Sequence, residues 1–363
     1  MKIAIMAPLV TAISEPQRGG SQAFVSDLAR GLTGRGHDVH VYAATGSDIP
    51  GVEVIDTGVD PGTLAGTLYR AFGPSEDDAG DGEASEAADT AFATAYEAMR
   101  SSRYDVIHNH AFDVPAIRLA TELKAPVVHT LHLPPDEAVS AALRDAARLS
   151  RPPAVAVVST SQAIAWGRIG AVDAILPPYP PVHAIPWSGT AGQGGALFAG
   201  RLSPEKGAAA AIDIARAAGL PIDVYGDVYD VSYSREQIDP RGNSPGVVLH
   251  RAVERGALWD VMNRSGVVLC PSSWDEPFGL AAAEAQACGT PVVAFNRGAL
   301  GEVILDGVTG FLVPPDDIAA AAEAVSRAAE ISRQSCRDHA EEHLDLGRSL
   351  DAHEDLYRRV ANG

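Results

Sequence analysis

The sequence predicts an α/β fold made of two doubly wound, Rossmann-like domains. With 363 residues the chain is longer than one typical hydrophobic core supports, which favours two domains. In both halves, short apolar runs of strand length alternate with segments of helical period, as in parallel sheets buried on both faces. The Pro- and Gly-rich stretch 177–195 interrupts this alternation and predicts a hinge.

The expected elements follow a β-α-β order in each half. The first half contains a helix at 21–36 and apolar strands, which are expected at 2–7, 38–43 and 52–57 and in the runs that begin at Asp105, Pro126 and Ala154. The second half contains strands and helices in alternation, with strands expected at 196–201, 221–226, 247–251, 267–272, 290–295 and 310–314, and helices at 208–219, 257–265 and 279–289.

We therefore predict three parts: an N-terminal domain at 1–182, a C-terminal domain at 183–348, and a terminal segment at 349–363. Within that last segment, DAHEDLYRRV at 351–360 has the amphipathic period of a helix that packs back on the first domain. The stretch 73–89 is rich in acidic and small residues, too polar to bury, and is expected to be a mobile loop.

The charge balance restricts the possible partners. The 28 Lys and Arg against 47 Asp and Glu give a net charge of −19, which opposes binding to nucleic acid and weakens docking to anionic lipid. A small soluble binding partner is favoured, and any bound anion must be held by local cations. The oligomeric state is not predicted.

Cysteine usage and hydropathy indicate a cytoplasmic protein. Cys270, Cys288 and Cys336 form no CxxC pair. The apolar run at the start stops at Pro8, before the length of a secretory signal, so we interpret it as a strand. No window approaches the roughly 18 apolar residues that a membrane span requires, so no integral membrane association is expected.

Two segments of the second half carry candidate chemistry. In GRLSPEKG, Arg201 ends a strand and Lys206 stands just before a helix, so two cations and free backbone N–H groups could hold a diphosphate. Alone, this segment is equally compatible with a solvated surface loop. It lacks the GK[ST] of a Walker A loop.

The second segment, EPFGLAAAE, runs from Glu276 to Glu284 and follows the apolar strand at 267–272. Glu276 is therefore placed at the carboxyl end of a strand, where ligands bind in open α/β sheets. A carboxylate there can accept two sugar hydroxyls, and Glu284, about two helical turns later, could reach ribose hydroxyls. A bare E-x7-E spacing would more simply be an exposed helix glutamate, but the EPFGL within it is more specific.

These segments resemble the donor signature of the family-4 retaining glycosyltransferases of GT-B fold. EPFGL with Glu284, ACGTPVV from Ala287, Gly19-Gly20 before the first helix, GRLSPEKG, and DGVTGFLVPP from Asp306 agree with that family in order and spacing. The resemblance extends over essentially the whole chain. It implies two Rossmann-like domains facing across a cleft, with the C-terminal helix crossing back to the first.

The resemblance also implies roles for individual residues. Donor phosphates would lie between Gly20, Arg201 and Lys206; Glu276 would bind the transferred sugar, Glu284 the ribose, and the base would lie near Val253. The full set of donor-binding candidates is Gly19, Gly20, Arg201, Lys206, Val253, Glu276, Pro277, Phe278, Gly279, Leu280 and Glu284. Arg251 and Tyr225-Gly226-Asp227 depart from the family pattern near the base.

Four histidines stand at the ends of expected strands in the first half: His108, His110, His129 and His132. Strand alternation puts His108 and His110 on one face. Such residues are more often buried structural histidines than catalysts, and a His cluster could also hold zinc, the least favoured interpretation. By resemblance, His132 matches the histidine beside the transferred sugar, and His110 matches a position in the acceptor region or cleft.

The chain contains no Asp-x-Asp pair, the metal clamp of the other large glycosyltransferase fold. We expect no metal and no cofactor, so Arg201 and Lys206 would stabilise the leaving diphosphate. The catalytic candidates are therefore His132, Glu276, Arg201 and Lys206. By resemblance the reaction retains the anomeric configuration, the departing phosphate assists deprotonation of the acceptor, and no side chain is assigned as the base.

The sequence disfavours three other functions. A nucleotide-sugar epimerase would need no acceptor pocket, and EPFGL with GRLSPEKG speaks against it. A non-catalytic nucleotide-sugar-binding protein is disfavoured by intact Glu276, Arg201, Lys206 and His132. An NAD oxidoreductase would require G-x-G-x-x-G after the first strand, which is missing.

The expected reaction moves a sugar from a nucleotide diphosphate donor to a hydroxyl of a small acceptor. Family frequency favours UDP over GDP or ADP. The Ala- and Gly-rich composition is compatible with a high-GC bacterial source, in which such enzymes act in secondary-metabolite or antibiotic biosynthesis. Synthesis of surface glycans or glycolipids is the alternative, and neither the sugar nor the acceptor is predicted.

Overall fold

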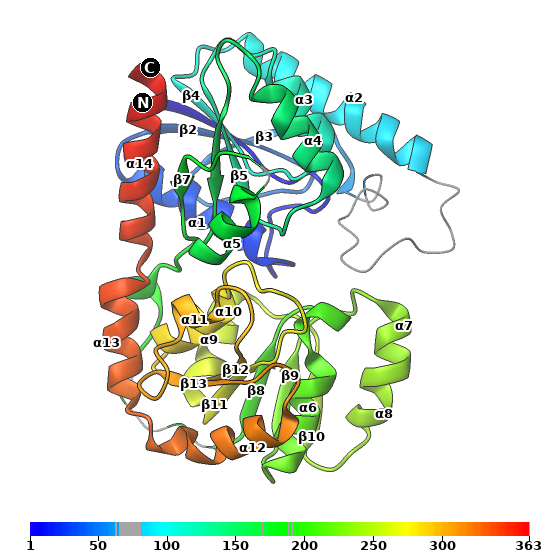
Figure 1. Ribbon diagram of the computed structural model, residues 1–363, viewed down its shortest axis with the longest axis vertical. Helices are drawn as coiled ribbons and strands as arrows, with labels where there is room; N and C mark the ends of the chain where they lie inside the picture. The colour runs from blue at the N-terminus through cyan, green and yellow to red at the C-terminus, as the bar shows by residue number, and fades with distance from the viewer. Residues whose placement is uncertain are drawn as a thin grey trace. The chain divides into compact units, whose positions relative to one another are not determined.

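The computed structural model describes residues 1–61, 64, 81–168, 170–187, 189, 192 and 194–362. The chain forms two compact units (Figure 1). The first unit contains Met1–Ser14, Ser21–Pro177 and Ser349–Gly363, and the second contains Glu15–Gly20 and Pro178–Arg348. A short piece of the N-terminal half, Glu15–Gly20, thus belongs by its contacts to the second unit.

The first unit is a seven-stranded parallel sheet with strands in the order β3-β2-β1-β4-β5-β6-β7. The strands are β1 (Lys2–Met6), β2 (Asp38–Ala43), β3 (Glu53–Asp56), β4 (Val106–Asn109), β5 (Val127–Leu131), β6 (Ala154–Val157) and β7 (Ala174–Ile175). Every one except the two-residue β7 was expected from an apolar run. The order reverses next to β1, which lies between β2 and β4, so the carboxyl ends of β1 and β4 form a topological switch point.

Helices cover both faces of this sheet. They are α1 (Gly20–Gly34), α2 (Asp81–Arg100), α3 (Val114–Ala120), α4 (Glu137–Ala146), α5 (Thr160–Gly167) and α14 (Leu346–Asn362). One face buries Ala4, Met6 and Ile107 against α2 and α3. The opposite face carries His108, which bonds Tyr357 of α14, so α14 completes the core of this unit (Figure 1).

Two sequence expectations need correction in the first unit. Residues 81–89 belong to α2 and do not form a loop, while 73–80 lie outside the described residues. The helix forms because Ala88, Ala91, Phe92 and Ala95 bury one face, while Glu86 is exposed and Asp89 is half-buried. The C-terminal helix begins at Leu346 and not at 351, because the Asp345 carboxylate accepts the Gly347 N–H at 2.8 Å and caps it.

The second unit is a six-stranded parallel sheet with strands in the order β10-β9-β8-β11-β12-β13. The strands, all at predicted positions, are β8 (Ala196–Ala199), β9 (Ile222–Tyr225), β10 (Val247–His250), β11 (Val267–Cys270), β12 (Val292–Phe295) and β13 (Gly310–Val313). Here the order reverses at β8 and β11, which pair directly. The loops that follow these two strands therefore meet at one edge of the sheet.

The helices of the second unit are α6 (Ala208–Ala217), α7 (Val231–Tyr233), α8 (Asp239–Gly242), α9 (Arg255–Arg264), α10 (Leu280–Ala287), α11 (Leu300–Val303), α12 (Ile318–Arg327) and α13 (Arg333–His343), with a 3-10 turn at Pro204–Lys206. The helices α6 and α12 bury Ala211, Ile212 and Val325 against one face of the sheet. Helices α9 and α10 pack against each other, and α10 also contacts β11 and β12.

Candidate functional site

The loop that carries Glu276 connects β11 to α10 and has a fixed backbone. Gly279 adopts φ 97° at the start of α10, a conformation that favours glycine. Gly298 lies so close that a Cβ there would be 2.3 Å from the Glu276 carbonyl oxygen. That oxygen also accepts the Ala299 N–H at 2.8 Å. The main chain at Glu276 is therefore held against the segment that follows β12.

Glu276 is 8% exposed, and its carboxylate receives four hydrogen bonds from three side chains. Lys206 Nζ lies 2.8 Å from Oε1 and 3.0 Å from Oε2. Ser272 Oγ and Trp274 Nε1 donate to Oε2 at 2.9 and 3.0 Å. Burial alone would raise the pKa of Glu276, but the Lys206 ammonium and these hydrogen bonds lower the pKa below its ordinary 4.5. Glu276 is therefore an anion at neutral pH.

Lys206 reaches Glu276 because a close backbone approach places it there. It ends the 3-10 turn after β8, and Gly207 follows with φ 76°. A Cβ on Gly207 would lie 2.0 Å from the Pro271 carbonyl oxygen, so only glycine allows this turn to rest on the loop after β11. The two predicted segments, GRLSPEKG and EPFGL, thus meet at the switch point of the second sheet.

Arg201 precedes Lys206 in the segment that follows β8 but binds other partners. Its Nη2 lies 3.1 Å from Glu205 Oε1, and its guanidinium carbon stands 4.6 Å from the centre of the Tyr229 ring. Glu205 also accepts the Ser203 hydroxyl at 2.6 Å. About a third of the Arg201 side chain, 32%, is exposed. Arg201 is thus held in place yet remains accessible to an anion.

Glu284 lies on α10 and is 5% exposed. Its Oε1 accepts hydrogen bonds from Arg255 Nε at 2.5 Å and from Trp259 Nε1 at 3.0 Å. Both donors belong to α9. Glu284 is thus not the exposed helix glutamate of the simpler interpretation.

The other donor candidates also belong to the second unit. A Cβ on Gly20 would lie 3.7 Å from Leu280, so the Gly19-Gly20 segment contacts the first residue of α10. Phe278 is buried and packs edge to face with Tyr179, with ring centres 5.7 Å apart. Pro277 is buried next to it, and Val253 is half-buried in the loop between β10 and α9.

The two remaining candidates, His110 and His132, lie together in the first unit, after β4 and β5. His110 Nδ1 is 2.8 Å from His132 Nε2. The rings of His108 and His110 have centres 4.0 Å apart, which confirms that they share a face of the sheet. His129 lies apart from them, 2.9 Å from the Asn109 side chain.

These histidines are neutral at pH 7. Burial, together with the charge of His353, lowers the pKa of His132 to about 4, and burial lowers the pKa of His110 well below its ordinary value. In the part of the chain that the structure describes, no three His, Cys, Asp or Glu side chains are arranged to hold a metal ion. The zinc interpretation therefore gains no support there.

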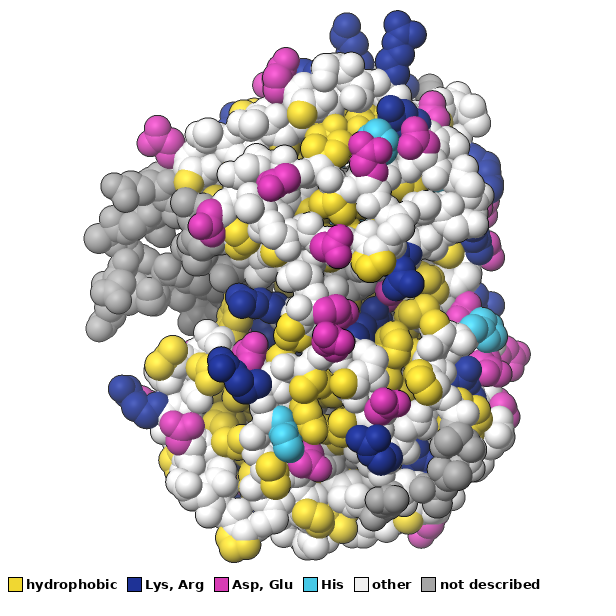
Figure 2. All heavy atoms as spheres, turned by 180° about the vertical axis from the view of Figure 1, so that it is seen from behind, with side chains coloured by type: hydrophobic (Ala, Val, Ile, Leu, Met, Phe, Trp, Pro, Cys, Tyr) yellow, Lys and Arg dark blue, Asp and Glu magenta, His cyan; other side chains and the backbone are white. Residues whose placement is uncertain are grey.

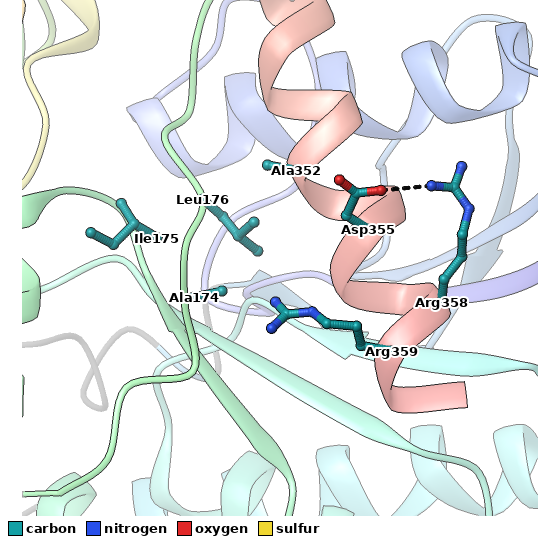
Figure 3. A pocket seen from close by; sticks show the side chains of 7 residues that line it. All are labelled: Ala174, Ile175, Leu176, Ala352, Asp355, Arg358 and Arg359. Atoms are coloured by element: carbon teal, nitrogen blue, oxygen red, sulfur yellow. Dashed lines mark hydrogen bonds and ion pairs between the residues drawn. The ribbon is translucent and has the colours of Figure 1, made fainter. Parts of the chain in front are cut away.

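The surface and cavities add little to this site. A shallow cavity of about 630 Å³ lies in the first unit between β7 and α14, lined by Ile175, Arg358 and Arg359 among others (Figure 3). No predicted site residue lines it. Acidic and basic side chains are interspersed on the face that Figure 2 presents. No described helix is long and apolar enough to cross a membrane.

Several residues that shape the site were not predicted. Trp274 lies two positions before Glu276, so its proximity was visible in the sequence, but its hydrogen bond was not. Tyr229, Arg255 and Trp259 contact the predicted residues only through tertiary structure. The single available signal was the four-residue spacing of Arg255 and Trp259, which puts both on one side of a helix.

Comparison with known proteins agrees with this architecture. Residues 18–170 match the model of Glycosyltransferase Family 4, and residues 191–343 match that of Glycosyl transferases group 1. The D-inositol 3-phosphate glycosyltransferase of Xylanimonas cellulosilytica is 31% identical over 364 residues, covering 87% of this chain and 85% of that protein.

Two solved structures share the fold. AviGT4, a glycosyltransferase involved in avilamycin A biosynthesis, has a TM-score of 0.71 at 22% identity, covering 100% of this chain and 98% of its own. HepE of Anabaena in complex with UDP-glucose has a TM-score of 0.72 at 20% identity, covering 98% of this chain and 99% of its own. The two parallel-sheet units and these matches define a glycosyltransferase of GT-B fold. The chain belongs to glycosyltransferase family 4.

Proposed function

We propose that this glycosyltransferase moves a sugar from a UDP-sugar to a hydroxyl of a small soluble acceptor, with retention of configuration and without a metal ion. The observation that carries the proposal is the ion pair of half-buried Lys206 with buried Glu276 at the switch point of the second sheet. It places a cation suited to phosphate beside a carboxylate suited to sugar hydroxyls. The likeness to HepE, whose structure contains UDP-glucose, supports UDP as the nucleotide.

In the proposed reaction, the bond between the sugar anomeric carbon and the diphosphate oxygen breaks, and its electron pair leaves with UDP. Lys206 and Arg201 stabilise the negative charge that develops on that oxygen. The acceptor hydroxyl forms the new bond from the same side, and its proton passes to the departing phosphate. Glu276 orients the sugar through its hydroxyls.

The acceptor is proposed to be a small polyol or a secondary metabolite. The name of the Xylanimonas relative specifies D-inositol 3-phosphate, and AviGT4 acts in avilamycin A biosynthesis. The net charge of −19 favours a soluble acceptor over an anionic membrane surface. Synthesis of a surface glycan or glycolipid is the alternative that an acceptor screen separates from this proposal.

The test is a matrix of UDP-, GDP- and ADP-sugars against acceptors that include D-inositol 3-phosphate. UDP release that depends on an acceptor, with a product whose anomeric proton coupling matches that of the donor, supports the proposal. An inverted product contradicts retention, and release from only GDP- or ADP-sugars contradicts UDP. Nucleotide binding without turnover with any acceptor would indicate a non-catalytic binding protein.

A further inference from the structure

The ion pair between Arg255 and Glu284 is the tightest charged contact at the donor site that the proposed function does not use. Arg255 Nε lies 2.5 Å from Glu284 Oε1, and the two side chains are 11% and 6% exposed. Trp259 Nε1 donates to the same oxygen at 3.0 Å. The Arg255 guanidinium also lies 5.1 Å from the centre of the Trp259 ring. One carboxylate oxygen is thus held by two rigid, planar donors.

The two donors are themselves fixed by α9. Arg255 is the first residue of the helix and Trp259 follows one turn later, so both project from the same side. The residue before the helix, Glu254, makes no side-chain capping bond, and Glu15 Oε2 accepts the Arg255 N–H at 3.0 Å instead. Glu15 belongs to the segment that leads into Gly19-Gly20. The Arg255 and Trp259 donors that hold Glu284 are therefore fixed by the segment that leads into Gly19-Gly20 as well as by α9.

The chemistry of the pair explains what this arrangement does. A buried carboxylate and a buried guanidinium each cost much more unpaired than paired, so each holds the other in place. Both donors engage Oε1, and no described residue donates a hydrogen bond to Oε2. The second oxygen is thereby oriented as an acceptor, which suits the hydroxyl of a ribose.

We propose that Arg255 and Trp259 are positioning residues that fix Glu284 by one oxygen so that the other selects a ribonucleotide donor. The proposal rests on the proposed function for the nucleotide site. It assigns the discrimination between ribose and deoxyribose to α9, a helix outside the EPFGL segment. A donor that lacks the ribose hydroxyl leaves the fixed Oε2 without a hydrogen-bond partner. Sites built to bind a hydroxyl strongly reject analogues that lack it, because their buried polar groups are then unpaired.

The test measures the dissociation constants of the full-length protein for UDP, 2′-deoxy-UDP and 3′-deoxy-UDP by calorimetry. We expect the wild-type protein to bind at least one deoxy analogue about tenfold more weakly than UDP, as for one hydrogen bond to a charged group. Arg255→Met should reduce that ratio to within about twofold, since Glu284 is then no longer held in one orientation. Trp259→Phe keeps an aromatic ring but removes the Nε1–H donor, and should give an intermediate ratio of dissociation constants.

The control is Arg264→Ala, which removes an exposed arginine from the last turn of the same helix and should leave the ratio at the wild-type value. A general loss of structure would weaken all three ligands equally, so the ratio separates positioning from folding. A ratio near one in the wild-type protein, or a wild-type ratio in both Arg255→Met and Trp259→Phe, would overturn the inference. Either result leaves acceptor-dependent transfer intact, whereas failure of the proposed function appears as absence of transfer.

Discussion

At the level of single residues, Glu276 and Lys206 form an ion pair, which an incoming donor would share in the proposed function. Glu276→Gln preserves the shape of the side chain but removes its charge, so both Lys206 and the sugar hydroxyls lose a charged acceptor. We expect kcat/KM for transfer to fall by about 10²–10³, the loss typical of one preorganised polar group in an active site.

The neighbouring Asp275→Asn is the matched control, because Asp275 is exposed on the same loop. It should retain wild-type kinetics. Equal losses in Asp275→Asn and Glu276→Gln would show that charge anywhere on this loop matters, and would remove Glu276 from the site.

The pH dependence of transfer provides a second test of the same pair. The pKa of Glu276 is lowered below 4.5 despite burial, chiefly by Lys206. Because the folded-state pKa is depressed, the pair stabilises the fold above pH 4.5 and loses that contribution as the pH falls through the folded-state value. In Lys206→Met only the hydrogen bonds from Ser272 and Trp274 still oppose the effect of burial on the pKa of Glu276, so the acid limb of kcat/KM should move to higher pH. An acid limb at the wild-type position would contradict the pairing, and exposed Lys124→Met serves as the control.

At the level of elements, the turn between β8 and α6 depends on Gly207. Alanine there would be strained at φ 76° and would place Cβ 2.0 Å from the Pro271 carbonyl oxygen. Gly219, after the other end of α6, has φ 71° but nothing within 4 Å of its Cβ position. We expect Gly219→Ala to lower the free energy of unfolding by about 1 kcal/mol and Gly207→Ala by about 2–4 kcal/mol.

Urea denaturation of the two variants measures this difference. Because Gly207 also places Lys206, Gly207→Ala should reduce transfer as well, whereas Gly219→Ala should not. Equal unfolding free energies for the two variants would show that the contact with Pro271 does not constrain the turn.

The elements that the sequence predicted best are those with the simplest physical cause. Buried parallel strands such as β11 and β12 are continuous apolar runs, and their order along the chain fixed where Glu276 would stand. The helix at 81–89 was missed because acidic composition concealed an apolar face that begins only at Ala88. The hydrogen bonds from Arg255 and Trp259 to Glu284 were not predicted because α9 and α10 become neighbours only in the folded unit.

At the level of the whole molecule, buried neutral histidines make the fold sensitive to acid. Burial lowers the pKa of His129, His132 and His353 to about 4, and that of His108 and His110 well below the ordinary 6.5. The unfolded chain therefore binds more protons than the folded one below pH 6.5. The free energy of unfolding should fall steadily from pH 6.5 towards 4, by up to about 1.4 kcal/mol per pH unit for each histidine.

His353→Gln tests this link, because His353 of α14 is buried and its Nδ1 bonds the Ser349 carbonyl at 2.7 Å. The variant should show a smaller decrease in unfolding free energy between pH 6.5 and 4. The exposed His183→Gln should show the wild-type decrease. If the free energy of unfolding does not change over this range in the wild-type protein, the histidines are not buried as neutral groups.

In the proposed function, Arg201 and Lys206 stabilise the leaving diphosphate in place of a metal ion. The most direct measurement is the initial rate of acceptor-dependent UDP release in EDTA compared with the rate in Mg²⁺ or Mn²⁺. We predict equal rates for the wild-type protein, and rates reduced to a similar extent under both conditions for Lys206→Ala. A rate that disappears in EDTA and returns when the metal is restored would contradict metal-independent transfer.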